Sequence, residues 1–276
     1  MSTSAFFPFT TLFDSHCHLN SEPLRKNAVD LVKQAQAAGV EKVIDVAVDL
    51  SSAVDALANA QKFPDVVYPT IGLDPELCVP GSDIYDASFS YEKIDQQIKK
   101  MRLMLGMDKY FMIGECGMDL YWLEKNQADK KVLQKSRELQ TYLFVKQLEL
   151  AKEFNLPLTI HQRGCFDELM SVVKPYVGSV MGVMHSFTGT YEQAKEIFAA
   201  GFAIGINAIV TYNSAQDLRG VVKKILGNKK LENPTDLYQK GIYLETDAPW
   251  LPPHGYKGKY NTPSSIRNIW EFILTV

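Results

Sequence analysis

The sequence lacks the features that mark several large classes of protein. Residues 1–10 hold no basic residue and no long apolar core, so they do not resemble a secretory signal. No uninterrupted apolar run approaches the roughly 20 residues of a membrane-spanning helix, and we expect no membrane partner. The formal net charge is only −3, which excludes a generally basic nucleic-acid-binding surface. Any anionic substrate must therefore meet a local positive charge.

Cysteine is also scarce, and the few cysteines are not arranged for bridging or for zinc. They show no Cys-x-x-Cys spacing and stand singly at Cys17, Cys78, Cys116 and Cys165. This pattern favours reduced, buried thiols, and so we expect a protein of the cytoplasm or the nucleus.

Apolar runs that fit buried strands recur along the chain, each followed by a helical pattern. The expected strands cover residues 11–13, 43–48, 66–73, 110–115, 156–161, 179–185, 202–206 and 241–247. Ser51 or Ser52 is predicted to cap the second helix, and Thr190 the helix that follows the sixth strand. At about 35 residues per unit, this repetition predicts the α/β class and a (β/α)8 TIM barrel, as one domain over residues 1–276. The alternative is an open doubly wound sheet, but no Gly-x-Gly-x-x-Gly follows the first strand.

Two histidines, His16 and His18, follow the first of these strands. Because strand side chains alternate with period two, Asp14, His16 and His18 are expected to share one face. Two imidazoles beside a carboxylate supply half of a metal site.

Polar residues end other strands in the same way. Besides His16 and His18, the residues at strand ends are Glu115, His161, His185 and Asp247. In a barrel these ends all face one rim, which is where barrel enzymes place their active sites. Six such ligands are too many for one tetrahedral ion and suit two ions that share a bridging carboxylate, for which Glu115 is the natural choice.

The mixture of imidazole and carboxylate favours Zn, Mn, Fe, Co or Ni over Ca, and Mg also fits if fewer nitrogens bind. Water activated between two ions predicts hydrolysis of a phosphoester, an ester or an amide, with Asp247 placed to accept a proton. A non-catalytic barrel with a structural metal is disfavoured, because structural sites are filled entirely by protein ligands.

Several blocks together resemble one family. They are Asp14-Ser15-His16-Cys17-His18, Gly114-Glu115-Cys116-Gly117-Met118-Asp119, Leu156-Pro157-Leu158-Thr159-Ile160-His161, His185-Ser186-Phe187-Thr188-Gly189 and Leu244-Glu245-Thr246-Asp247-Ala248-Pro249. In this order they resemble the TatD family of metal-dependent deoxyribonucleases, from about residue 12 to the end of the chain. The resemblance implies that His16, His18, Glu115, His161, His185 and Asp247 bind two divalent ions (Mg, Mn or Zn), with Glu115 and Asp247 catalytic. It also implies hydrolysis of DNA, often from the 3′ end, with single strands or short ends as the partner. A metal-dependent deacylase or amidohydrolase acting, for example, on an aminoacyl-RNA is the alternative. We expect a monomer.

The chain departs from the family pattern at three places. One is the segment from Tyr121 to Lys135, which is longer and more charged than is usual and is expected to form a rim loop. Family members often carry Gly-[Ile/Leu]-His-Pro after the third strand, whereas Gly72-Leu73-Asp74-Pro75 puts an acid at the histidine position. An ionised carboxylate there would repel a phosphate. The sequence also stops at Val276, where family members usually continue past the eighth helix, so we expect a shortened chain.

Other residues near the expected rim have predicted roles outside the ligand set. Arg163 is predicted to clamp a phosphate with its planar guanidinium group, and a surface ion pair is the alternative. Tyr121 and Trp122 could stack on an unpaired base or simply pack. Lys257 and Lys259 are expected mainly to solvate a loop, His254 to be a loop residue, and Asn261 to bond locally.

Overall fold

The computed structural model describes residues 7–125 and 128–276. Within them, eight parallel strands form a sheet in which each strand pairs with the next along the chain. The strands are β1 (Phe13–Cys17), β2 (Lys42–Asp45), β3 (Val67–Ile71), β4 (Met112–Asp119), β5 (Leu158–Arg163), β6 (Gly182–Met184), β7 (Ala203–Ile206) and β8 (Ile242–Leu244).

The last strand returns to the first, so the sheet is a nearly closed barrel. The amide of Asp247 donates to the carbonyl of His16 over 2.8 Å, and the amide of His18 donates to the carbonyl of Ala248 over 2.8 Å. Lower down, the Asp14 carboxylate accepts hydrogen bonds from the amide and the hydroxyl of Thr246. These contacts confirm the predicted (β/α)8 TIM barrel.

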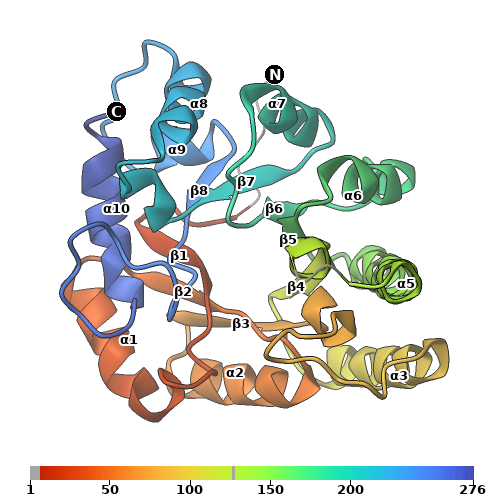
Figure 1. Ribbon diagram of the computed structural model, residues 1–276. Coiled ribbons are helices and arrows are strands. Elements are labelled where there is room, and N and C mark those ends of the chain that lie inside the picture. The colour runs from red at the N-terminus through yellow and green to blue at the C-terminus, as the bar shows by residue number, and fades with distance from the viewer. Residues whose placement is uncertain (1–6, 126–127) are drawn as a thin grey trace.

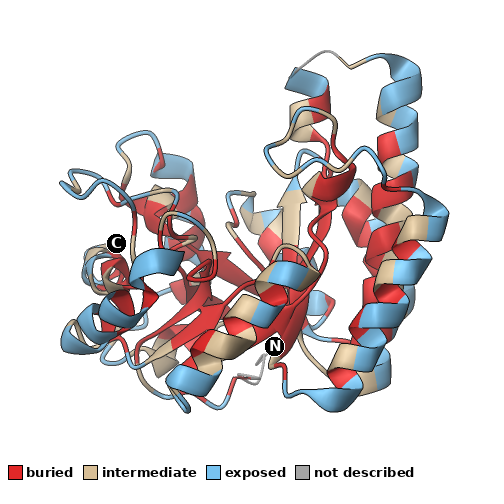
Figure 2. Ribbon diagram, turned by 90° about the horizontal axis from the view of Figure 1, so that it is seen from below, coloured by how far each residue is buried: buried red, intermediate tan, exposed pale blue. Residues whose placement is uncertain are grey.

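Helices surround the barrel, as Figure 1 shows. They are α1 (Ala28–Ala37), α2 (Leu50–Lys62), α3 (Tyr91–Met107), α4 (Tyr121–Lys125), α5 (Lys130–Phe154), α6 (Phe166–Val173), α7 (Tyr191–Ala199), α8 (Gln216–Leu226), α9 (Thr235–Tyr238) and α10 (Ile266–Ile273). Their inward faces are buried and their outward faces are exposed, as Figure 2 shows. Among the described residues, no helix combines the length and the apolar character that a bilayer crossing requires.

Aromatic rings close the amino end of the barrel. Phe7 contacts Tyr243 of β8 at 4.7 Å between ring centres and Phe111, just before β4, at 5.7 Å. Phe9 contacts Phe13 of β1 and Tyr68 of β3, each at 4.8 Å. Since β8 and β4 lie on different sides of the barrel, the segment before β1 crosses this end and covers it. We call these six rings the aromatic end.

Two local predictions needed correction. Asp49, not Ser51 or Ser52, caps α2: its side chain accepts from the Ser52 amide, and the Ser52 hydroxyl accepts from the Asp49 amide. The expected first strand, residues 11–13, is instead β1 from Phe13 to Cys17, so that His16 lies inside a strand. The third expected strand is confirmed as β3, in which Pro69 pairs with Asp45. Thr190 caps α7 as predicted, in a capping box with Gln193.

Candidate metal centre

The six predicted ligands lie together at the carboxyl end of the barrel, opposite the aromatic end. His16 belongs to β1, Glu115 to β4 and His161 to β5. The other three follow strands directly or within a few residues: His18 after β1, His185 after β6 and Asp247 after β8. His16, His18, Glu115 and His185 are at most 5% exposed, while the His161 and Asp247 side chains keep 16% and 14% of their surface in solvent. The cluster is therefore a buried site with two members open at the rim.

One half of the cluster comes from β1 and the end of β8. The Nε2 atoms of His16 and His18 are 3.1 Å apart. Glu115 Oε2 lies 3.5 Å from His16 Nε2 and 3.6 Å from His18 Nε2. Asp247 Oδ1 is 4.0 Å and 3.5 Å from the same two nitrogens. Four donor atoms thus surround one point.

The other half comes from β5 and β6. His161 Nδ1 and His185 Nε2 are 3.0 Å apart, and Glu115 Oε1 lies 2.9 Å from the first and 2.8 Å from the second. The His16 and His185 rings stack at 4.0 Å and tie the two halves together. Glu115 therefore presents one oxygen to each histidine pair.

The outer ring nitrogens of His18 and His161 donate hydrogen bonds away from the cluster, so the inner nitrogen of each neutral ring has its lone pair facing the cluster. His18 Nδ1 lies 2.9 Å from the Val46 carbonyl, which can only accept, so this nitrogen carries the proton. His161 Nε2 lies 3.0 Å from an Asp119 carboxylate oxygen and donates in the same way. In each neutral ring the inner nitrogen then offers a lone pair, as a metal-ligating histidine does. The donor set and its orientation fit divalent cations in both halves.

Without a cation, the carboxylates hold protons on the histidines. Burial disfavours the charged form of His18, but the hydrogen bond to Asp247 and the charge of Glu115 outweigh it and raise the pKa of His18 to about 9. Burial also disfavours the charged form of His161, but the hydrogen bonds to Asp119 and Glu115 outweigh it and raise the pKa of His161. Burial lowers the pKa of His16 to about 4, helped by His185. His18 and His161 are therefore held toward their protonated forms, opposite the ionised carboxylates of Glu115 and Asp247.

The structure adds residues that the sequence reasoning did not assign. Asp119 orients His161, and Thr159 Oγ1 lies 2.9 Å from His16 Nδ1. Glu245 is fully buried, accepts from the Ser186 amide and lies 3.8 Å from His185 Nδ1. Asp119 and Glu245 both occur in the quoted family blocks, but no spacing rule showed that they stand behind histidines.

Asp74 lies near the centre, at the start of a 3-10 turn after β3. It is 5% exposed, and its carboxylate accepts from the Glu76 amide over 2.7 Å. Burial and the charge of Glu115 raise the pKa of Asp74 well above its ordinary value. The acid at the family's histidine position is thus held toward its neutral form, which removes much of the expected repulsion of a phosphate.

Other predicted residues lie outside the cluster. The Asp14 carboxylate bonds to Thr246 and to the His16 amide and so joins β1 to β8; the expectation that it completes the His16–His18 set is wrong. Asn261 is buried and bonds to the carbonyls of Thr246 and Leu251, which confirms the local role. His254, Lys257 and Lys259 are exposed residues after β8. All four cysteines are free and buried, as predicted.

A TIM barrel with this cluster at its carboxyl rim defines the class of metal-dependent hydrolases. The chain belongs to the TatD family: the family model described as "TatD related DNase" matches residues 13–276.

Relatives by sequence and by structure agree with this assignment. An uncharacterized metal-dependent hydrolase of Bacillus subtilis, YabD, is 30% identical over 95% of this chain and 89% of its own. A protein of Erwinia tasmaniensis named 3′-5′ ssDNA/RNA exonuclease TatD is 29% identical over 93% of this chain and 86% of its own. The crystal structure of the TatD homologue YjjV of Escherichia coli superposes with a TM-score of 0.72 at 26% identity, covering 96% of this chain and 89% of that one.

Proposed function

We propose that this chain is a divalent-metal-dependent deoxyribonuclease that removes nucleotides from the 3′ end of DNA, with one cation in each half of the cluster. The observation that carries the proposal is the position of Glu115, whose two carboxylate oxygens face two separate histidine pairs. A single-ion site would leave one of these pairs without a role. Cations bound there would act as Lewis acids on a phosphate oxygen and make a water molecule acidic.

Asp247 is the proton acceptor in this proposal. Burial opposes its ionisation, but the hydrogen bond from His18 and the charges of His185 and His16 lower the pKa of Asp247 below its ordinary value. It is therefore ionised at neutral pH, and its partial exposure at the rim gives a water molecule access to it. Glu115 stays ionised as well, because the histidines around it outweigh its burial and lower its pKa.

The surrounding residues hold the ligands in place. Thr159, Asp119 and the Val46 carbonyl fix the rings of His16, His161 and His18 from behind. Such outer contacts set ring orientation and typically change metal affinity or activity by about 10- to 100-fold when removed.

A phosphodiester suits this rim better than a carbonyl substrate because of Arg163. It follows His161 by two residues on β5, so both side chains leave the strand on the same side. A guanidinium group one step outward from a ligand can pair with the anionic backbone that flanks the bond to be cut. The printed name of the Erwinia relative, an exonuclease on single-stranded DNA and RNA, supports the same substrate class.

The test is a panel of substrates with the protein stripped by chelator and reloaded with Mg, Mn or Zn. A single-stranded DNA labelled at its 5′ end should shorten stepwise from the 3′ end, and Glu115→Gln should abolish this shortening. An RNA of the same sequence and an aminoacyl ester form the comparison arms. Cleavage of the ester alone would overturn the proposal in favour of a deacylase, and internal cuts in the DNA would overturn the exonuclease assignment.

A further inference from the structure

Two aromatic rings and two cations form a compact group beside the metal centre. We call Tyr121, Trp122, Lys125 and Arg163 the rim cluster. We propose that the rim cluster binds an unpaired nucleotide of the polynucleotide chain, with the base on an aromatic ring and the cations on the backbone phosphate. This inference rests on the proposed function and adds to it a contact that holds a single strand next to the site of cleavage.

The rim cluster lies where β4 and β5 end. Asp119 and Arg163, the last residues of the two strands, pair in register, and the amide of Leu120 donates to the Arg163 carbonyl over 2.9 Å. Tyr121 and Trp122 follow directly in α4. Asp119 also holds His161 at 3.0 Å, so a single residue joins the metal centre to the start of this group.

The two cations lie on the aromatic rings. The Arg163 guanidinium carbon is 3.8 Å from the centre of the Tyr121 ring and 5.3 Å from that of Trp122. Lys125 Nζ is 4.6 Å from the Trp122 ring centre and 5.4 Å from that of Tyr121. Both rings are half-buried and both cations are exposed, so solvent reaches the cations from outside.

Trp122 is fixed in place from the side of the protein. Its ring packs against the buried core and meets the Tyr121 ring edge-on at 5.3 Å between ring centres. Burial raises the pKa of the nearby Glu76 carboxyl, and Trp122 partly offsets this rise. The Glu76 amide in turn donates to the carboxylate of Asp74, which caps the 3-10 turn that holds Glu76. The ring therefore starts from a fixed orientation, and little conformational entropy is lost when a ligand stacks on it.

An unpaired nucleotide matches this chemistry in two respects. A base stacked on an aromatic ring is worth more than a solvent-exposed cation–π contact, so a base can displace a cation from the ring face. The displaced guanidinium or ammonium group then meets the phosphate of the same nucleotide. In a chain with net charge −3, this exchange supplies the local positive charge that an anionic substrate requires.

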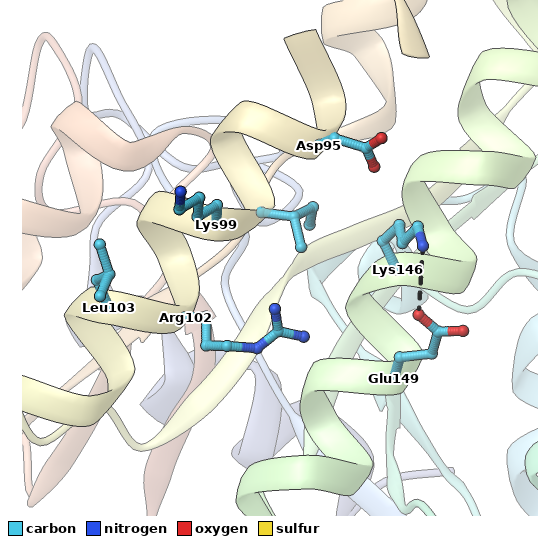
Figure 3. A pocket seen from close by; sticks show the side chains of 7 residues that line it. Asp95, Lys99, Arg102, Leu103, Lys146 and Glu149 are labelled. Atoms are coloured by element: carbon cyan, nitrogen blue, oxygen red, sulfur yellow. Dashed lines mark ion pairs between the residues drawn. The ribbon is translucent and has the colours of Figure 1, made fainter. Parts of the chain in front are cut away.

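A second face of the molecule also combines an aromatic ring with cations, but it lies on the outer helices and contains acids as well. Between α3 and α5 a cleft of about 430 Å³ is lined by cations and acids alike, among them Lys99, Lys146, Asp95 and Glu149 (Figure 3). Next to it, Lys146 Nζ lies 5.2 Å from the ring centre of Tyr142. The acids offset the cations, and the residues belong to helices on the outside of the barrel, not to strand ends. Tyr142 is therefore a matched control for Trp122.

The direct test is binding of a labelled ten-nucleotide oligo-dT, followed by fluorescence anisotropy in the Glu115→Gln background so that the DNA is not cut. Adding Trp122→Ala should raise the Kd about 5- to 50-fold, Trp122→Phe should retain most of the affinity, and Tyr142→Ala should change the Kd less than about twofold. Arg163→Gln, which removes charge without emptying a packed position, should weaken binding and reduce its dependence on salt. Equal, small effects of Trp122→Ala and Tyr142→Ala would overturn the proposal.

A kinetic comparison separates this inference from the proposed function. For the protein with Glu115 intact, Trp122→Ala should lower kcat/KM for the oligonucleotide about tenfold more than kcat/KM for bis(4-nitrophenyl) phosphate, chiefly through KM. A fully paired blunt duplex should bind with no dependence on Trp122. Failure to cleave either phosphodiester with any metal would refute the proposed function, whereas equal losses on both substrates would refute the role of the rim cluster alone.

Discussion

The two ends of the barrel bury side chains of opposite character. The aromatic end joins rings from the chain start, β1, β3 and β8, with no charge among them. The carboxyl end holds four histidines and two acids, and the neighbouring donor atoms within each half of the cluster lie between 2.8 and 4.0 Å apart. Burial of apolar rings stabilises the fold, while burial of ionisable groups costs free energy unless they are paired. Stability and chemistry are therefore expected to separate along the barrel axis.

The largest expected effect is on activity, at the carboxyl end. Asp247→Asn should lower kcat/KM for DNA about a thousandfold or more, because the amide cannot accept a proton and is a poor ligand. Asp247 has a φ of 54°, a conformation that Asn tolerates well, so the backbone should not change. Chemical denaturation of the metal-free protein should show a shift in unfolding free energy below about 1 kcal/mol. A large loss of stability would contradict the separation of the two ends.

The converse change is Phe9→Ala at the aromatic end. Phe9 is 7% exposed and contacts Phe7, Phe13, Tyr68 and Phe111, so its removal leaves a cavity. We expect a loss of about 3–5 kcal/mol in the free energy of unfolding, read from urea titrations. Activity per folded molecule should stay within about twofold of the parent protein at a temperature where both are folded. A parallel fall in kcat would show that the two ends are coupled.

Removal of metal tests how far the carboxyl end depends on cations. A cation that binds only the folded chain stabilises it by about 3–4 kcal/mol at 100 to 1,000 times its Kd. Chelation should therefore lower the unfolding midpoint by a comparable free energy and leave the circular dichroism spectrum of the barrel intact. Elemental analysis of the reloaded protein should give two ions per chain. Chelation with no change in the midpoint would contradict a cation-filled cluster.

The smallest effect concerns the dependence of stability on pH. Burial, opposed by hydrogen bonds from Asn59 and Asn20, raises the pKa of Asp45 from 3.8 to about 6. The folded chain then binds this proton more tightly than the unfolded chain, so stability falls as pH rises from about 4 to 6 and is constant above that range. Asp45→Asn should remove about 1–2 kcal/mol of this decline in urea titrations of metal-free protein at pH 4.5 and 7. An equal decline in both proteins would show that Asp45 does not carry it.

The six candidate metal ligands could be predicted because each is a polar residue at the end of an apolar strand. His161 and Glu115 each follow apolar runs, and parallel strands bring such ends to one rim. The contacts behind the ligands could not be predicted in this way. Asp119 reaches His161 across 42 residues of chain and Thr159 reaches His16 across 143, and neither pairing has a sequence period.

The sequence by itself determined the repeating strand–helix order, the barrel and the six polar strand ends, because periodicity and the chemistry of side chains act locally. Only the tertiary structure decided that Glu115 faces both histidine pairs, that Asp14 joins β1 to β8, and that Arg163 lies on Tyr121. It also brought Phe7 and Phe9 across the amino end of the barrel. These contacts depend on strand register and on the rotamers of residues far apart in the chain, which are fixed only when the whole core packs.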